Sequence, residues 1–298
     1  MFDTFKNRLE LSGTLTTITA LRIGQGRSSE PIGSDLPVVK DAFGQPLIPG
    51  SSFKGALRSR LESFVRGIDE RLAKDPSELV DTEITERVAQ LKKEHESNDR
   101  ALTNALNGMT DEVSKLFGTP WQASKFQVRD LAVKPETWFN QYQERDGVSI
   151  DRDTDTAADG RLYDFQVVPA GVEFDFKAIF ENAEAATING EEIDYWELGL
   201  LAIGLEQFKQ QQVPLGGGIS RGLGVVQLDI EKVSWVDPAS PTELIDYMKR
   251  LSEDELGHYQ LTDDTFTEHK RDWVGALITY LSHAANISTP EEANASNA

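Results

Sequence analysis

Residues 32–61 combine two carboxylates, Asp35 and Asp41, with the basic side chains of Lys40, Lys54, Arg58 and Arg60, in a chain whose formal net charge is −20. Lys54 and Arg58 are four residues apart, so they share one face of a helix that we expect to begin near Ser51. The free N–H groups at a helix start attract anions, and Lys and Arg bind phosphates. These residue types predict contact with a sugar-phosphate backbone, with a solvated helix face as the alternative.

Asp35 precedes the apolar run Leu-Pro-Val-Val and lies in a Gly-Ser loop. One interpretation is an Asx turn or cap before a strand. The other is a carboxylate poised next to a bound phosphodiester, because basic residues follow in the same stretch. The four histidines lie far apart, at positions 95, 258, 269 and 283, without the spacing of metal ligands. The histidines therefore predict no metal site.

Residues 216–224, GGGISRGLG, are the second candidate for ligand contact. They are not a dinucleotide-binding loop, because Arg221 replaces the third glycine and the loop leaves a predicted helix and opens a strand. Five glycines in nine residues allow the backbone to approach a ligand closely, and backbone N–H groups beside an arginine suit a phosphate. The residues expected to contact the ligand are Gly216, Gly217, Gly218, Ser220 and Arg221.

The elements that position these residues follow from the periodicity of apolar side chains. The pattern predicts a helix after residue 51 and a buried helix at 198–208. Strands are predicted at 8–23, 36–40, 126–133, 162–168, 172–180 and 225–235. The order strand, helix, strand, strand, helix, strand predicts an α+β fold with a ferredoxin-like βαββαβ core. A doubly wound parallel sheet is the competitor, and it is disfavoured because residues 162–180 are predicted to form a hairpin.

Two insertions and an extension decorate this core, which we assign to a domain of residues 1–236. Residues 67–117 are predicted to be helical, and residues 134–160 form a long polar loop. Residues 237–298 hold twelve acidic and four basic residues and are predicted to be a helical extension with a disordered end. Residues 1–66 hold nine basic and six acidic residues, so a local basic face remains within the acidic chain.

Composition narrows the class of protein further. The chain has no cysteine, which excludes disulfides, thiolate catalysis and cysteine-based zinc sites. It has no apolar run long enough to span a membrane, and the first residues lack the apolar segment of a signal peptide. We therefore expect a cytoplasmic protein that does not associate with a membrane.

Three separated segments resemble one family. They are IGSDLPVVKDAFGQPLIPGSSFKGALRSRLE, IDRDTDTAADGRLYDFQVVPAG and LGGGISRGLGVVQL, and the resemblance covers roughly residues 8–235. The chain resembles the RAMP-superfamily backbone subunits of type III CRISPR effector complexes. The resemblance implies an RRM-like core with a thumb-like hairpin. The implied partners are a guide RNA (crRNA), a complementary target RNA, related backbone subunits, and the large and small subunits of the complex.

The resemblance also implies roles for individual residues. Lys54, Arg58 and the glycine-rich loop would grip the guide backbone, with Arg22 and Arg27 along the same path. Arg152 would lie in the thumb. Asp35 matches the aspartate that catalytic members use to cleave target RNA, a reaction usually assisted by a divalent cation such as Mg²⁺. The alternatives are a non-catalytic structural subunit and, less favoured because no histidine is nearby, a guide-processing ribonuclease.

Overall fold

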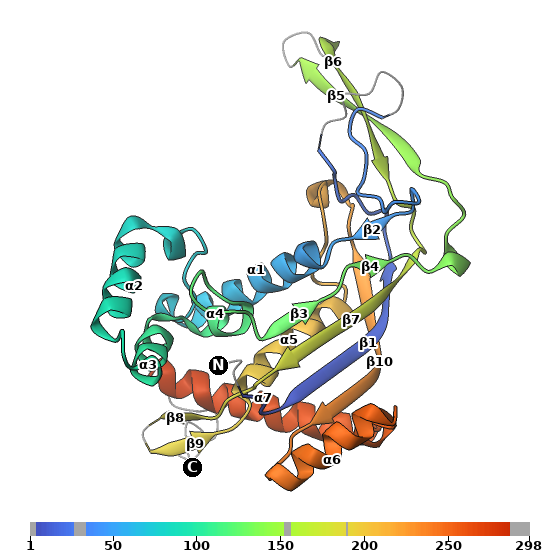
Figure 1. Ribbon diagram of the computed structural model, residues 1–298. Coiled ribbons are helices and arrows are strands. Elements are labelled where there is room, and N and C mark those ends of the chain that lie inside the picture. Colours follow the sequence, from blue (N-terminus) through green and yellow to red (C-terminus); the bar gives the residue numbers. More distant parts are fainter. Residues whose placement is uncertain (1–3, 27–33, 152–155, 189, 287–298) are drawn as a thin grey trace, which may run out of the picture.

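A four-stranded antiparallel sheet, in the order β10-β1-β7-β3, forms the centre of the molecule (Figure 1). The computed structural model describes residues 4–26, 34–151, 156–188 and 190–286. The sheet strands are β1 (Arg8–Thr17), β3 (Phe126–Val128), β7 (Glu173–Glu181) and β10 (Val226–Val236). Helix α1 (Gly50–Ile68) lies between β1 and β3 in the chain, and α5 (Trp196–Lys209) lies between β7 and β10.

Alternating side chains explain why these strands form a half-buried sheet. Leu9 and Leu15 of β1 pair with Phe180 and Phe174 of β7, and all four side chains are buried. Most intervening positions of both strands are polar, with Ile179 an exception, so one face of the sheet is apolar and the other is mainly polar. Gly13 lies beside a bulge where a Cβ atom would meet the Asp229 carbonyl oxygen at 2.0 Å, so only glycine fits there.

Helices α1 and α5 cover the apolar face. Phe53 of α1 stacks on Phe208 of α5, with ring centroids 4.4 Å apart, and contacts Phe176 of β7 at 5.1 Å. Burying such a side chain contributes about 1.5–3 kcal/mol. The two helices can approach closely because Gly204 of α5 has no side chain. A Cβ atom there would lie 2.4 Å from Leu57 of α1. The core therefore sits between the sheet and these two helices.

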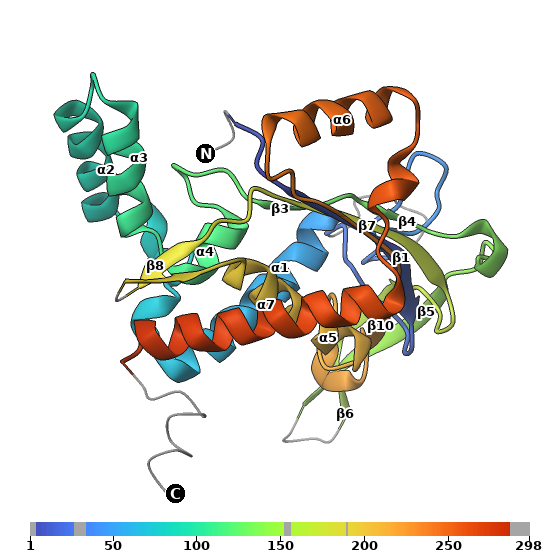
Figure 2. The ribbon, with the colours of Figure 1, turned by 90° about the horizontal axis from the view of Figure 1, so that it is seen from below.

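The remaining elements surround this core. The strands β2 (Leu47–Ile48) and β4 (Leu131–Ala132) pair with each other, as do β8 (Ala186–Ile188) and β9 (Glu191–Ile193). The other helices are α2 (Thr82–Glu94), α3 (Asp99–Met109), α4 (Glu112–Phe117), α6 (Pro241–Ser252) and α7 (Asp263–Ala284). Short 3₁₀ turns occupy Glu70–Leu72, Glu78–Val80, Pro135–Thr137, Ile219–Arg221 and Leu256–Tyr259. Helix α7 lies across α5 (Figure 2).

A long hairpin projects from one end of the sheet (Figure 1). Its strands are β5 (Gln143–Asp151) and β6 (Thr156–Val167), which pair antiparallel. The prediction of a hairpin over residues 162–180 is therefore wrong, because β6 pairs with β5 while β7 pairs with β1 and β3. The connection between β6 and β7 is attached to β1, because the Gly171 N–H donates to the Thr17 carbonyl and the Thr17 N–H donates to the Val172 carbonyl.

Two further predictions about local structure are wrong. Residues 134–160 were expected to be irregular, yet most of them belong to the hairpin. Their polar sequence hides the strand because a projecting two-stranded hairpin has no core to face. Residues 36–40 form isolated bridges instead of a strand, from Leu36 to Phe165 and from Val38 to Gly24. The antiparallel registers also exclude the doubly wound parallel sheet.

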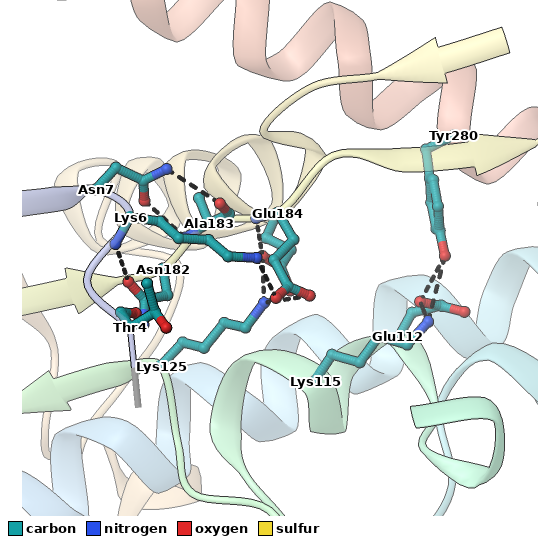
Figure 3. Close-up of polar contacts among 11 residues, drawn as sticks. Thr4, Lys6, Asn7, Glu112, Lys115, Lys125, Asn182, Ala183, Glu184 and Tyr280 are labelled. Carbon is teal, nitrogen blue, oxygen red and sulfur yellow. Dashed lines mark hydrogen bonds and ion pairs between the residues drawn. The ribbon is translucent and has the colours of Figure 1, made fainter. Parts of the chain in front are cut away.

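A buried ion pair links the segment before β3 to helix α5, and Figure 3 shows its lysine, Lys125, beside Glu184. Lys125, just before β3, donates to both carboxylate oxygens of Glu197 in α5, at 2.7 and 2.9 Å. Their side chains are 1% and 2% exposed. Burial raises the pKa of Glu197, and the Lys125 ammonium opposes that effect. Glu184 lies 3.7 Å from the same ammonium and is also paired with Lys6 near the N-terminus.

The C-terminal helix is held by a second polar group and by aromatic stacking. Tyr280 of α7 donates to Glu112 of α4 at 2.8 Å (Figure 3), and its ring stacks on Trp196 with centroids 4.0 Å apart. Burial, followed by the charge of Glu112, raises the pKa of Tyr280, so its hydroxyl remains a neutral donor. Within the described part of the chain, no helix has the length and apolar content that crossing a lipid bilayer requires.

Candidate nucleic-acid interface

A pocket of about 350 Å³ lies at the base of the projecting hairpin. Three parts of the chain that are distant in sequence form it: the segment after β1, the hairpin, and the glycine-rich loop before β10. The lining residues are Arg22, Leu36, Arg145, Asp146, Tyr163, Phe165, Gly218, Arg221 and Leu223. Three arginines and two aromatic rings therefore face one cavity.

The glycine-rich loop is attached to the segment after β1 through the backbone. The Gly217 N–H donates to the Arg22 carbonyl at 2.8 Å, and the Gly224 N–H donates to the Ala20 carbonyl at 2.9 Å. Gly216 has a φ of +76°, and a Cβ atom there would lie 2.1 Å from the Arg22 carbonyl oxygen. The glycines are thus required for close packing of two backbone segments, which fixes Arg221 relative to Arg22.

The two arginines contact the aromatic residues of β6. The guanidinium of Arg22 lies over the Phe165 ring, 5.0 Å from its centroid. Arg221 Nη1 lies 3.4 Å from the Tyr163 hydroxyl, and the Arg221 side chain is exposed. Guanidinium groups beside aromatic rings can bind backbone phosphates while the rings stack with bases. This arrangement suits single-stranded nucleic acid.

Asp35 is held against the hairpin by its backbone. Its N–H donates to Asp164 Oδ1 at 2.9 Å, and the next residue, Leu36, accepts from the Gln166 N–H at 3.1 Å. The Asp35 side chain is half-buried. Neither Asp35 nor Asp164 lines the pocket, but both are chain neighbours of residues that do: Leu36 follows Asp35, and Tyr163 and Phe165 flank Asp164. The structure thus brings Asp35 near Arg22 and the glycine-rich loop.

The carboxylates of this region suit a hard divalent cation that completes its coordination with RNA. Mg²⁺ is usually bound through one or two carboxylates plus substrate phosphates. Two acids meet here, because the Asp35 backbone N–H donates to the Asp164 carboxylate. In the described ranges, no three His, Cys, Asp or Glu side chains form a group that would hold a metal by themselves. The residues therefore fit a cation shared with a nucleic-acid ligand.

Lys54 and Arg58 are not part of this pocket. Lys54 donates to the Ser124 hydroxyl at 2.6 Å. Arg58 is paired with Glu62 at 2.7 Å and donates to the Ser114 hydroxyl at 2.9 Å. Both side chains thus hold α1 against the segment that contains α4. This geometry favours a structural role for both, and their contact with RNA stays a prediction.

The protein is expected to become more stable as the pH rises from about 8 to 10.5, because Lys54 is half-buried and loses its proton more readily in the folded state. Burial, with a smaller effect of Arg58, lowers the pKa of Lys54 from 10.5 to about 8. In this interval the unfolded chain binds the proton more strongly than the folded protein does, so raising the pH favours folding. Urea unfolding at several pH values measures the free energy of unfolding. This free energy should rise less over the same pH interval for a Lys54→Met variant than for the wild-type protein. Superimposable pH profiles would contradict the prediction.

Sequence reasoning missed several residues of the pocket. Tyr163 and Phe165 were predicted only as part of a strand, and Arg145 and Asp146 lay in what was expected to be a loop. Alternation in the run Leu-Tyr-Asp-Phe-Gln-Val-Val placed Tyr163, Phe165 and Val167 on one face, but the pairing partner was needed to see which segment they meet. Two predicted RNA-binding residues, Arg27 and Arg152, lie outside the described residues. Ser220 is exposed and does not line the pocket.

Comparison with known proteins identifies the family of this chain. The sequence model of the RAMP superfamily matches residues 14–227. The protein named CRISPR system Cms endoribonuclease Csm3 from Enterococcus italicus is 26% identical over 234 residues, covering 77% of this chain and 94% of that protein. The proteins of the same name from Mycobacterium tuberculosis and Methanocaldococcus jannaschii are 40% identical over 73 residues and 45% identical over 60 residues. These shorter alignments cover 24% and 20% of this chain, and 31% and 24% of those proteins. Because the superfamily match spans most of the chain, this protein belongs to the RAMP superfamily.

Proposed function

We propose that this chain is a guide-RNA-binding backbone subunit of a type III CRISPR interference complex, and that it cleaves the paired target RNA through Asp35. Its similarity to proteins named CRISPR system endoribonuclease supports the assignment to such a complex. The observation that carries the proposal is the pocket at the base of the hairpin. There, Arg22 and Arg221 face a common cavity and Asp35 is hydrogen-bonded to the hairpin strand that lines it.

The arrangement of the core supports the same assignment. The chain order β1, α1, β3, β7, α5, β10 and the sheet order β10-β1-β7-β3 correspond to a ferredoxin-like, RRM-like βαββαβ core. In this interpretation the hairpin β5–β6 is the thumb. The guide would pass the junction of thumb and core, where Arg22 and Arg221 bind its phosphates and the partly buried Tyr163 offers a ring for stacking.

Asp35 would act on the target strand. The 2′-hydroxyl of one nucleotide attacks its adjacent phosphorus, the bond to the 5′-oxygen of the next nucleotide breaks, and a 2′,3′-cyclic phosphate and a 5′-hydroxyl result. This reaction depends on in-line geometry, which the thumb can impose by displacing a base. The Asp35 carboxylate accepts a hydrogen bond from the attacking hydroxyl and orients it. The hydrogen bond from the Asp35 backbone to Asp164 keeps that carboxylate in place.

A divalent cation, most simply Mg²⁺, would be held by Asp35 and Asp164 together with the RNA phosphate. When bound, it supplies positive charge that stabilises the developing negative charge on the phosphate. The remaining partners in the proposal are related backbone subunits and the large and small subunits. The cellular compartment we propose is the cytoplasm.

Substituting Arg22 or Arg221 by alanine is expected to weaken guide RNA binding. Removing one ion pair with a phosphate should also reduce the slope of log affinity against log salt by about 0.7. Binding of a single-stranded guide RNA at several salt concentrations measures both quantities. Arg100→Ala removes the same charge from an exposed site on α3, far from the hairpin, and should leave both unchanged. The RNA-binding assignment is wrong if Arg22→Ala, Arg221→Ala and Arg100→Ala all behave like wild type.

A further inference from the structure

A second pocket has a volume of about 440 Å³. The strand β9 and the helix α7, which contribute to its lining, lie away from the hairpin (Figure 1). The pocket is formed where β9 leads into α5, where β10 ends, and by one side of α7. It lies apart from the proposed RNA path, and none of its lining residues belongs to the pocket at the hairpin base. It therefore needs an explanation of its own.

Aromatic rings form the walls of this pocket. Tyr195 meets Trp235 edge to face at 5.6 Å, and Trp235 meets Trp273 in the same manner at 5.7 Å. His269 stacks on Trp273 at 5.4 Å. Trp273 is buried, whereas Tyr195 and Trp235 are only partly buried and thus present ring surface to the cavity.

Tyr195 is fixed in this position. Its φ of 58° is uncommon for a residue other than glycine, and its hydroxyl donates to Asp237 Oδ2 at 2.6 Å. Burial, followed by this hydrogen bond, raises the pKa of Tyr195, so the hydroxyl stays protonated. The aromatic wall is thereby tied to the acidic rim.

The rim of the pocket is negatively charged. Four carboxylates line it, those of Glu192, Asp194, Asp237 and Asp272, and no Lys or Arg does. Of these, Asp237 accepts the Tyr195 hydroxyl. The other three side chains have no hydrogen-bond or ion-pair partner in the portion of the chain that is described. Unpaired acids around an aromatic cavity favour a cation, through the charge and through the negative faces of the rings.

We propose that this pocket binds a Lys or Arg side chain of a partner protein. The carboxylates repel RNA phosphates, so stacking of a nucleotide on the Trp and Tyr rings is disfavoured. A purely apolar side chain would leave the acids of the rim unpaired. A long basic side chain satisfies both parts of the site, because its stem packs on the rings and its head group meets the carboxylates.

Short peptides test the proposal directly. Acetyl-Gly-Arg-Gly-amide should shift the tryptophan indole N–H signals of the full-length protein in a saturable manner, and a Trp235→Phe variant identifies one of those signals. The same peptide with citrulline, which has nearly the same shape but no charge, should bind at least about tenfold more weakly. Binding of the arginine peptide should also weaken as salt is added.

Variants of the rim supply the matched comparison. An Asp194→Asn/Asp272→Asn protein should bind the arginine peptide about tenfold more weakly. Glu268→Gln, which removes one exposed charge from α7 outside the pocket, should change binding less than twofold. The proposal is overturned if no saturable shift occurs, if citrulline binds equally well, or if a uridine hexanucleotide shifts the same signals instead. Unchanged thermal midpoints of the surface variants establish that they fold.

Discussion

Replacing Asp35 with alanine in the assembled ribonucleoprotein is expected to slow cleavage of the target RNA at this subunit's site by at least about 100-fold. The expected loss is large because Asp35 is the carboxylate proposed to orient the attacking hydroxyl and to hold the cation. Guide RNA binding should stay within about twofold of wild type, since the arginines of the pocket remain. Single-turnover cleavage of a labelled, complementary RNA measures the rate.

Three companion variants separate chemistry from structure. Asp35→Asn keeps the shape and removes the charge, so it should resemble Asp35→Ala. Asp164→Asn keeps an acceptor for the Asp35 N–H and should lower the rate less. Glu86→Gln removes an exposed acid on α2 and should have no effect. Cleavage by Asp35→Ala at the wild-type rate would instead favour a non-catalytic structural subunit. Chelation of divalent cations should abolish the same cleavage if the cation takes part.

Removing Lys125 alone is expected to destabilise the protein by about 3–5 kcal/mol. The substitution leaves the Glu197 carboxylate buried without its ammonium partner, and burial of an unpaired charge is costly. A Lys125→Met variant tests this in urea, where the midpoint of unfolding should fall. The ion pair joins the segment before β3 to α5. We therefore expect its removal to destabilise the whole core and not only one edge of it.

The double variant Lys125→Met/Glu197→Leu provides the informative comparison. Replacing both charges with apolar groups should recover most of the lost stability, because no unpaired charge remains. Lys270→Met, which breaks an ion pair with Glu206 at the surface, should cost only about 0.2–1 kcal/mol. If Lys125→Met proves no more harmful than Lys270→Met, the buried pair does not stabilise the fold as described.

Local periodicity was sufficient to predict most of the core. Leu9, Leu15, Phe174 and Phe176 alternate with polar residues, and the helix after residue 51 repeats its apolar side chains every three to four residues. The strands β1, β7 and β10 and the helices α1 and α5 follow from such patterns. The strand β5 did not, because its sequence QERDGVSID is mostly polar and a projecting two-stranded hairpin has no core to impose an apolar face.

The site was only partly predictable for a related reason. Asp35 and Arg221 were identified from residue type and a family resemblance, and the structure places both beside the hairpin. The sequence correctly predicted that Lys54 and Arg58 lie in one helix, four residues apart on the same face. Nothing in their own sequence revealed that the inserted helices fold back onto that face. The Lys125–Glu197 pair spans 72 positions, so no local pattern identifies it.

The most direct test of the RNA-binding site is ultraviolet crosslinking of the complex to its own guide RNA, with the linked peptides identified by mass spectrometry. Aromatic side chains stacked on bases crosslink readily, so Tyr163 should carry the RNA, and the glycine-rich loop should lie in a linked peptide. Crosslinks confined to α2, α3 or α7, with none on the hairpin or the glycine-rich loop, would contradict the proposed RNA path.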